Sequence, residues 1–343
     1  MLIAMNIRRL IPALAACLAL LPLSGASAQD GSFPAFIQWL SAKARSEGVS
    51  EGTIARMTEG LTPNERVISL DRAQPGTPTA TGFPSMRGYL DDHNSAQRIA
   101  AGRRAYQAAG ATRSDIERRY GIPSAVLFAI WGHETNYGSF KGSFDLSRSL
   151  ATLAWEGRRR DLFSQEWVDL LKIADLGVRR ETLVGSWAGA FGHPQFLPSI
   201  YLRLAVDGDG DGHRDIWNNH TDTLHSIANY FRDAGWRPGQ PWGVRASIPD
   251  GFNWNAVQSK TASPVCPRVH ERHSQWKTVA EWKLLGVTPR AAIFDDVMAT
   301  LFQPDGPGTP SYLLTQNYRV ILEYNCSNYY ALSVGLLADE IAR

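Results

Sequence analysis

A single glutamate, Glu134, lies near the end of an apolar run that has the pattern of a helix. The run follows Pro123, which suits the first turn of a helix, and stops at Gly138, which suits the position just past a helix end. Val126, Ile130 and Glu134 follow one another at spacings of four, so the carboxylate belongs to the apolar face. We therefore expect Glu134 to be largely buried.

Burial would raise the pKa of Glu134, because it disfavours the charged form, and the negative end of the helix dipole would act in the same direction. A carboxyl group with a raised pKa can act as a general acid near neutral pH. The alternative is an ion pair with a distant Arg or Lys, which would also perturb the pKa. A zinc site is not predicted, since the metalloprotease motif requires a second histidine where Tyr137 stands.

Residues 207–218, DGDGDGHRDIWN, form a second segment with the chemistry of a binding site. Oxygen donors occupy the ligand positions of an EF-hand loop, in the order Asp207, Asp209, Asp211, His213 through its backbone carbonyl, Asp215 and Asn218. The last position normally carries a bidentate Glu, and Asn218 offers a single oxygen. We expect a structural Ca²⁺ clip with a weak Kd of about 10⁻⁴–10⁻³ M. The alternative is a polar turn that binds nothing.

The segment SWAGAFGHPQFLPSIY, residues 186–201, combines small residues with aromatic and neutral polar ones. Ser186 and Gln195 offer hydrogen-bonding groups beside aromatic surface, which suits a sugar-binding cleft. Tight helix packing explains the same pattern, so this segment alone does not decide between the two.

The N-terminal residues predict export. Two arginines precede an apolar run over residues 10–23, and a small-residue cleavage site follows at residues 26–28. We expect a signal peptide over residues 1–28, with release after Ala28. Cleavage before Cys17, which would leave a lipid anchor, is the alternative that we favour less. The apolar run is too short to span a membrane.

Charge and cysteine content narrow the class of protein further. The chain of 343 residues has a formal net charge of +2 with its basic residues spread along the sequence, so no nucleic-acid partner is predicted. Cys266 and Cys326 would remain after processing. In an oxidising compartment they can form a disulfide, and two unpaired buried thiols are the alternative.

Periodicity predicts a mainly helical chain with a small β-rich part. Helical patterns cover residues 33–70, where Ser50 is a plausible N-cap, and extend from residue 86 beyond residue 229. Short apolar runs between Pro and Gly suggest strands over residues 237–317, and a helical pattern returns from Asn328. The expected units are residues 29–105 (helical), 106–236 (catalytic core with the EF-hand-like loop), 237–320 (β-rich) and 321–343 (a helix returning to the core).

Several motifs together resemble the lytic murein transglycosylase B family. They are GHETNYG, the run from SWAGAFGHPQFLPSIY into DGDGDGHRDIWN, then SIANYFRDAGW and YNCSNYYALSV, in matching order and spacing. The resemblance implies an α+β, predominantly α-helical, lysozyme-like fold with a helical lobe, a central core and a small β-rich domain.

The resemblance also implies roles. Glu134 would be the catalytic acid and then the base, and the residues that would line the cleft are Ser186, Gln195, Tyr324, Asn325 and Tyr330. The chain departs from the family pattern at His193-Pro194, where Tyr-Gly is common, and at Asn218. The substrate would be peptidoglycan glycan strands in the periplasm of a Gram-negative bacterium. Catalysis would need no cofactor, the enzyme would be a monomer, and any recruiting partners would belong to cell-wall synthesis or division.

Two other functions remain open. A hydrolytic muramidase or chitinase would need a second carboxylate facing Glu134, and Asp145, Glu156 or Asp161 could supply it. A non-catalytic glycan-binding protein stabilised by Ca²⁺ would bind sacculi without cleaving them.

Overall fold

The computed structural model describes residues 31–74, 85–260, 263 and 265–343. The expected signal peptide and Cys17 lie outside these residues. In the part of the chain that is described, no helix is long and apolar enough to cross a membrane.

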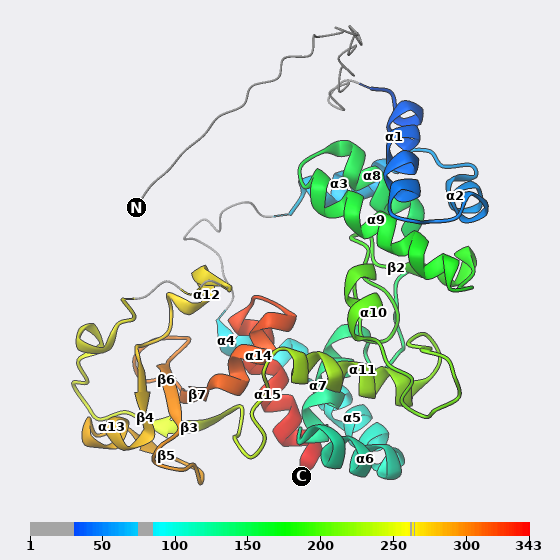
Figure 1. Cartoon of the computed structure of the whole chain (residues 1–343). Helices are drawn as coiled ribbons and strands as arrows, with labels where there is room; N and C mark the ends of the chain where they lie inside the picture. The colour runs from blue at the N-terminus through cyan, green and yellow to red at the C-terminus, as the bar shows by residue number, and fades with distance from the viewer. Residues whose placement is uncertain (1–30, 75–84, 261–262, 264) are drawn as a thin grey trace, which may run out of the picture.

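A helical lobe stands apart from the rest of the molecule (Figure 1). Its helices share one apolar cluster and are α1 (Phe33–Ser46), α2 (Glu51–Thr58), α3 (Glu65–Arg72), α8 (Leu146–Glu156) and α9 (Arg160–Asp175). Ser50 caps α2 as predicted, since its hydroxyl accepts a hydrogen bond from the Thr53 amide at 3.2 Å. Leu40 and Trp167 are fully buried at the centre of this lobe.

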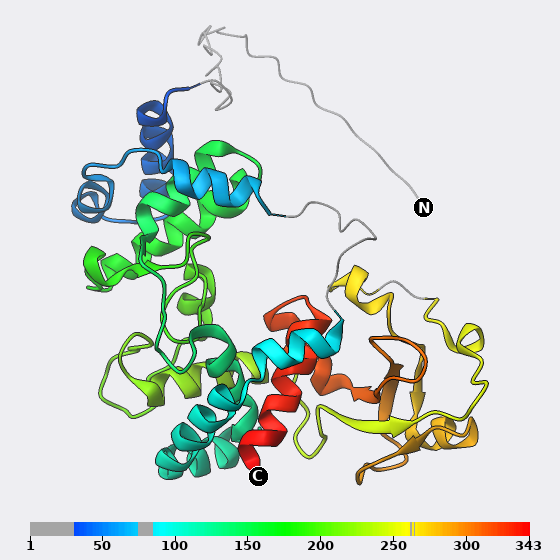
Figure 2. The same cartoon turned by 180° about the vertical axis from the view of Figure 1, so that it is seen from behind.

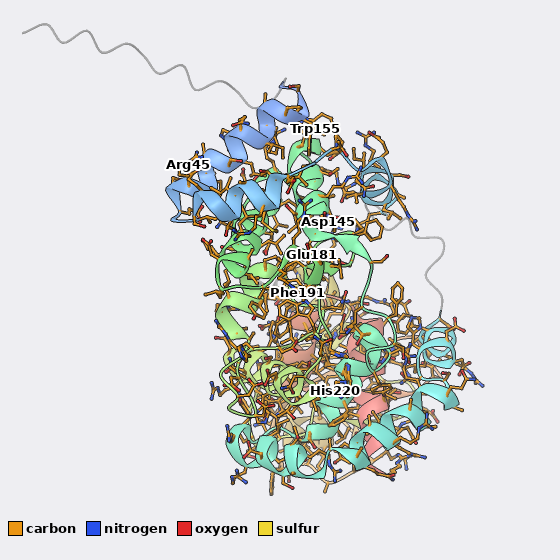
Figure 3. The ribbon with its side chains drawn as sticks, turned by 90° about the vertical axis from the view of Figure 1, so that its right-hand side faces the viewer. Arg45, Asp145, Trp155, Glu181, Phe191 and His220 are labelled. Atoms are coloured by element: carbon orange, nitrogen blue, oxygen red, sulfur yellow. A yellow bond between two sulfur atoms is a disulfide. The ribbon has the colours of Figure 1, made fainter. Side chains whose placement is uncertain are left out.

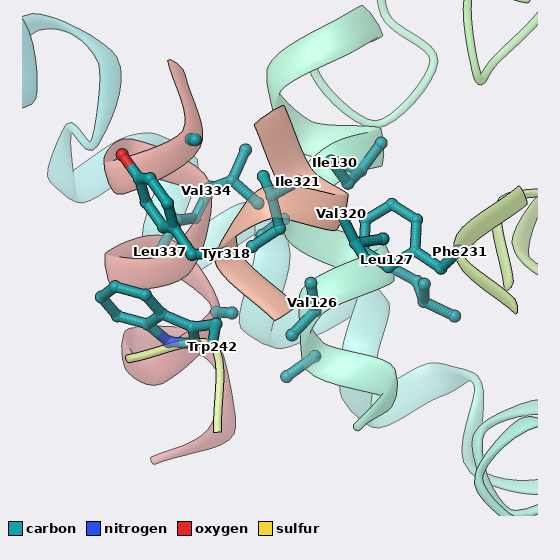
Figure 4. Close-up of a cluster of buried hydrophobic side chains, with 14 of the residues drawn as sticks. Val126, Leu127, Ile130, Phe231, Trp242, Tyr318, Val320, Ile321, Val334 and Leu337 are labelled. Atoms are coloured by element: carbon teal, nitrogen blue, oxygen red, sulfur yellow. The ribbon is translucent and has the colours of Figure 1, made fainter. Parts of the chain in front are cut away.

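A second cluster forms the core around α7 (Ser124–Thr135). The helices that surround α7 are α4 (Met86–His93), α5 (Ala96–Ala108), α6 (Gly110–Tyr120), α11 (His220–Asp233), α14 (Gln316–Tyr324) and α15 (Asn328–Ala342). Figure 4 shows Val126, Leu127 and Ile130 of α7 packed among Val320 and Ile321 of α14 and side chains of α15. All residues from Ser124 to Gly132 are buried, so α7 is a central helix without a polar face.

The third unit is a small antiparallel sheet with the strand order β4-β6-β7-β3-β5. The strands are β3 (Gly243–Ser247), β4 (Trp276–Thr278), β5 (Thr288–Pro289), β6 (Met298–Phe302) and β7 (Ser311–Thr315). Among the short apolar runs that predict strands over residues 237–317, WGVRASI (residues 242–248) contains β3 and YLLTQ (residues 312–316) overlaps β7. Trp282 of α13 (Val279–Leu284) is fully buried against this sheet.

Short elements connect these units. They are η1 (Arg180–Thr182), α10 (Pro198–Leu204), η2 (Trp254–Val257), α12 (Pro267–His270) and the antiparallel pair β1 (Phe144–Asp145) and β2 (Val184–Gly185). The predicted disulfide is present between Cys266, just before α12, and Cys326, between α14 and α15. It joins the β-rich unit covalently to the core.

The predicted fold class, a mainly helical α+β chain with a small sheet, is confirmed. The apolar clusters divide the chain differently from the expected units, however. Within the expected core of residues 106–236, α8 and α9 bury their apolar faces against α1–α3, while α7 and α11 belong to the other cluster. Helical periodicity identifies an apolar face but not the partner that covers it, so the sequence predicted the helices and not this division.

Candidate active site

Glu134 lies in the last turn of α7, where the helix ends abruptly. Asn136, Tyr137 and Gly138 have φ angles of 49°, 57° and 86°. A Cβ atom added at Gly138 would stand 2.2 Å from the ring of His193, so only glycine fits this close approach. The chain therefore turns away directly after Glu134 and leaves its carboxylate at the end of a buried helix.

The carboxylate of Glu134 combines a low-dielectric environment with access to solvent. The side chain is largely buried, as expected, and keeps some exposure because the last turn of α7 reaches the surface of the core. Burial raises the pKa of Glu134 to about 7, and the hydrogen bond from Tyr330 acts in the opposite direction. The Tyr330 hydroxyl donates to Oε1 at 2.5 Å. A carboxyl group with this pKa is partly protonated at neutral pH and can both donate and accept a proton.

His133 ties the end of α7 to α15 and to Asn94, the residue that follows α4. Its Nε2 lies 3.0 Å from the Ser333 hydroxyl of α15, which donates a 2.7 Å hydrogen bond to Oδ1 of Asn94. Burial lowers the pKa of His133 to about 3, so the imidazole is neutral and adds no charge beside the carboxylate.

His193 contacts the end of α7 through two hydrogen bonds. Its Nδ1 accepts a 2.9 Å hydrogen bond from the Trp131 indole, and its backbone carbonyl accepts one from the Thr135 hydroxyl at 3.1 Å. Burial lowers the pKa of His193 to about 4, in keeping with a neutral ring that accepts at Nδ1. The next carbonyl, of Pro194, accepts a 2.5 Å hydrogen bond from Tyr324. The unusual His-Pro pair therefore links α7, the segment 186–201 and α14.

Ser186 and Gln195 lie on the same segment and are half-buried. The Ser186 hydroxyl accepts a hydrogen bond from the Ala190 amide at 3.0 Å. Gln195, with a φ of 51°, donates through Nε2 to the carbonyls of Gly192 at 3.0 Å and Lys141 at 3.2 Å. These bonds hold the segment against the chain that leaves α7 and fix both side chains in place.

The residues expected from the C-terminal motif begin where α14 ends. Tyr324 is half-buried and Asn325 is exposed, while Tyr330, in the first turn of α15, is buried. Of the five expected cleft residues, Tyr330 contacts Glu134 directly. The charge of Glu134 contributes to the raised pKa of Tyr324, and burial is the larger cause.

The three carboxylates that a hydrolase could use as its second acid, Asp145, Glu156 and Asp161, are not found in contact with Glu134 within the described residues. Asp145 caps α8 and lies 2.8 Å from Arg180, and Figure 3 shows it on the side of the helical lobe. Glu156 lies 3.1 Å from Arg72, and Asp161 belongs to the first turn of α9. Within the described residues, burial is what raises the pKa of Glu134, with no contribution from a neighbouring carboxylate.

Tyr89 and Ser333 were missed by sequence reasoning. The charge of Glu134 contributes to the raised pKa of Tyr89, with burial as the larger cause, and the Tyr89 ring stacks on His93 at 3.8 Å. Tyr89 belongs to no recognised motif, and Ser333 lies within YNCSNYYALSV but offers no charged group that would single it out. Each reaches the site through the packing of α4 or α15 on α7.

The EF-hand-like loop brings together a carboxylate trio that differs from the expected ligand set. Oxygens of Asp207, Asp211 and Asp222 lie within 4.8 Å of one another. Asp222, in the first turn of α11, lies beyond the last position of the motif and was therefore missed. Other expected ligands bind groups of the chain: Asp209 accepts from Asn219 at 2.7 Å, and Asp215 accepts from the Trp217 and Asn218 amides, both at 2.9 Å. His213 is exposed.

The donor set of this trio fits a hard divalent cation. Asp222 is buried, and burial raises its pKa, with the charges of Asp209 and Asp207 adding to the effect. A bound cation would offset this repulsion, and carboxylate oxygens are the ligands that Ca²⁺ prefers.

Comparison with known proteins identifies the family. Residues 32–339 match the family model described as transglycosylase SLT domain. Membrane-bound lytic murein transglycosylase B of Escherichia coli is 32% identical over 231 residues, 65% of this chain and 58% of that protein. The match therefore spans less than two thirds of that relative.

Two solved structures are similar over most of the chain. SltB3 from Pseudomonas aeruginosa, in complex with NAG-anhNAM-pentapeptide, is 34% identical with a TM-score of 0.82, covering 91% of this chain and 80% of that one. The Escherichia coli lytic transglycosylase Slt35 in complex with calcium is 26% identical with a TM-score of 0.72, covering 90% and 92%. The family model spans nearly all described residues, and the fold of the chain agrees with these solved structures. The chain therefore belongs to the transglycosylase SLT domain family.

Proposed function

We propose that this protein is a lytic transglycosylase. It would cleave the β-1,4 bond between N-acetylmuramic acid and N-acetylglucosamine in peptidoglycan, without water, and form 1,6-anhydromuramyl ends. The observation that carries the proposal is the carboxyl group of Glu134, partly exposed, with a pKa of about 7 and a single hydroxyl donor. One group that can be either protonated or ionised near neutral pH suits a reaction that needs an acid and then a base.

In the first step, the protonated Glu134 donates its proton to the glycosidic oxygen, and the bond between that oxygen and the anomeric carbon of the muramic acid breaks. The substrate's own N-acetyl oxygen attacks the anomeric carbon, so no protein nucleophile is required. This substrate-assisted route differs from glycosidases that use two carboxylates. The different contacts of Asp145, Glu156 and Asp161 support the single-carboxylate route.

In the second step, the ionised Glu134 takes the proton of the 6-hydroxyl group, and O6 bonds to the anomeric carbon as the N-acetyl oxygen leaves. Glu134 is protonated again and no water is consumed. Tyr330 stabilises the ionised form between the two steps by donating to Oε1. Ser186 and Asn325 would orient the N-acetyl group through neutral hydrogen bonds, a positioning role.

The names of the relatives support the substrate class. The matching Escherichia coli protein is called a murein transglycosylase, and SltB3 was solved with both NAG-NAM-pentapeptide and NAG-anhNAM-pentapeptide. The disulfide between Cys266 and Cys326 agrees with an oxidising compartment, and we propose the periplasm as the place of action. A structural Ca²⁺ at Asp207, Asp211 and Asp222 would hold the loop before α11, away from the reaction itself.

The test is mass spectrometry of the fragments that the mature protein releases from purified sacculi, with Glu134→Gln alongside. Anhydromuramyl ends from the wild type and none from the variant support the proposal. Free reducing ends would instead indicate a hydrolase with a second acid. Binding of sacculi by both proteins without release would indicate a glycan-binding protein.

A further inference from the structure

A cavity of about 650 Å³ lies between the sheet and the C-terminal end of the core, separate from Glu134. It is bounded by α14, the strands β4 and β6 and the segments on either side of α12, which lie together in Figure 2. Its lining residues are Ser259, Lys260, Ser263, His270, His273, Ser274, Gln275, Trp276, Thr300 and Arg319. Its volume falls within the range of small-ligand sites, about 300–1,000 Å³.

The lining of this cavity carries positive charge without a compensating carboxylate. Lys260 and Arg319 are its cations, and no Asp or Glu belongs to the lining. Burial lowers the pKa of His270 to about 4 and of His273 to about 3, so both rings are neutral at physiological pH. The Nδ1 and Nε2 atoms of His273 are engaged by Thr300 at 3.0 Å and Asn328 at 2.8 Å. The remaining lining is polar and neutral apart from the ring of Trp276.

Within the described residues, Arg319 makes no ion pair at 4.0 Å or less with a carboxylate. One terminal nitrogen donates to the Ser263 hydroxyl at 2.9 Å, and the guanidinium lies 5.8 Å from the Trp276 ring centre. Its Nε is covered by protein atoms and makes no hydrogen bond with the part of the chain that the structure describes. Burial raises the pKa of Glu323, one turn further along α14, and the charge of Arg319 lowers it, but the two groups are not in ion-pair contact. The two terminal nitrogens of a half-buried guanidinium fit a carboxylate, which accepts from two nitrogens at once.

The elements that line the cavity also carry residues of the candidate active site. Arg319 precedes Tyr324 by five residues on α14, about 7.5 Å along the helix axis. Asn328, which contacts His273, begins the helix that carries Tyr330, the donor to Glu134. The disulfide connects Cys266, between Ser263 and His270, to the residue after Asn325. An extended pentapeptide spans about 17 Å, so a peptide attached to a sugar beside Asn325 can reach Arg319.

We propose that this cavity binds a carboxylate of an acidic peptide, the peptide stem carried by the glycan strand, and so selects strands that bear stems. This inference rests on the proposed function for the identity of the glycan. Its occupant fits the pentapeptide that SltB3 carries on its bound sugars in the solved complexes. Arg319 would provide the bidentate contact, Lys260 a second charge at the rim, and Trp276 an apolar wall.

Direct binding tests the site without any cleavage. The mature protein is titrated calorimetrically with a soluble acidic pentapeptide, with the same peptide fully amidated at its carboxyl groups, and with inorganic phosphate. We expect Arg319→Gln to weaken binding of the acidic peptide about tenfold or more. Lys260→Ala, at an exposed position, should weaken it less, and the matched control Arg268→Gln, an exposed arginine outside the lining, should leave it unchanged. Equal binding of the amidated peptide, or tighter binding of phosphate, would overturn the proposal.

Cleavage kinetics provide the second arm. For strands that carry stems, Arg319→Gln should raise KM and leave kcat unchanged, whereas for strands stripped of stems it should change neither. Equal effects on both substrates would show a merely structural role for Arg319, and Lys260→Ala keeps the test valid if Arg319→Gln proves unstable. If the wild type cleaves neither substrate but binds the acidic peptide through Arg319, the proposed function fails and the peptide site stands.

Discussion

Tyr330 and Glu134, which are 196 positions apart in the chain, meet in a 2.5 Å hydrogen bond at the ends of two packed helices. The bond stabilises the ionised carboxylate, while burial favours the neutral acid. These two influences set the pKa of Glu134 near 7.

Replacing Glu134 by Gln should reduce cleavage of sacculi by about 10²–10⁴-fold, the usual contribution of a general acid–base group. For the wild type, kcat/KM should fall as pH rises above about 7, because the first step needs the protonated carboxyl group. Anhydromuramyl product formed over a pH series is the measurement. A rate that rises steadily through pH 8 would contradict Glu134 as the acid.

Tyr330→Phe should move the falling limb of this pH profile to higher pH by about one unit. The hydrogen bond from Tyr330 lowers the pKa of Glu134, so its loss lets burial raise the pKa further. Tyr324→Phe is the matched control, because that hydroxyl donates to the Pro194 carbonyl instead. A shift of equal size in both variants would assign the effect to packing.

Glu134→Gln should stabilise the protein above pH 7 and have less effect near pH 4. In the wild type, the folded-state pKa of about 7 lies above the ordinary value of 4.5, so the unfolded state binds fewer protons between these values. The stability of the wild type therefore falls as pH rises through this window, and a neutral amide avoids that loss. Thermal midpoints of both proteins at pH 4 and pH 8 measure the difference. A larger difference between the two thermal midpoints at pH 4 than at pH 8 would contradict the raised pKa of Glu134.

Calcium in excess should raise the thermal midpoint by about 3 °C or more relative to chelator, since it would bind the folded loop alone. Asp222→Asn should abolish most of this shift, because Asp222 belongs to the carboxylate trio. Asp209→Asn should keep it, because Asp209 lies outside the trio and binds Asn219. Identical midpoints of the wild type in calcium and in chelator would exclude a structural metal here.

Removing the disulfide by Cys266→Ser together with Cys326→Ser should lower the free energy of unfolding by about 4 kcal/mol in the chain-entropy model. The bond closes a loop with a sequence separation of 60. Denaturant unfolding of the double variant, compared with the wild type in the oxidised and reduced states, measures the loss. An unchanged midpoint after full reduction would mean that packing alone holds Cys266 beside α14.

The structural features that the sequence predicted correctly depend on residues close together in the chain or on the chemistry of one residue type. Periodicity identified the helix of Glu134, although Pro123 lies at its N-cap position and the helix ends at Thr135, three residues before Gly138. The Ser50 hydroxyl identified a helix start, and the two cysteines identified a disulfide. A helix and its cap depend on residues within a few positions of one another. A disulfide depends on a cysteine having another cysteine to pair with, and Cys266 and Cys326 are the two that would remain after processing. The resemblance to a known family predicted the fold class that the structure and the comparisons confirm.

The tertiary structure alone determined which distant segments pack together and which side chains meet in each site. α8 and α9 join the helical lobe because α1–α3 cover their apolar faces, and Asp222 joins the loop carboxylates because α11 begins beside them. Tyr330, Tyr89 and His193 reach the end of α7 from three separate segments. The sequence by itself determined that a carboxylate would interrupt an apolar helix. Its pKa follows from burial and a hydrogen-bond donor in another helix, and both exist only when the helices are packed.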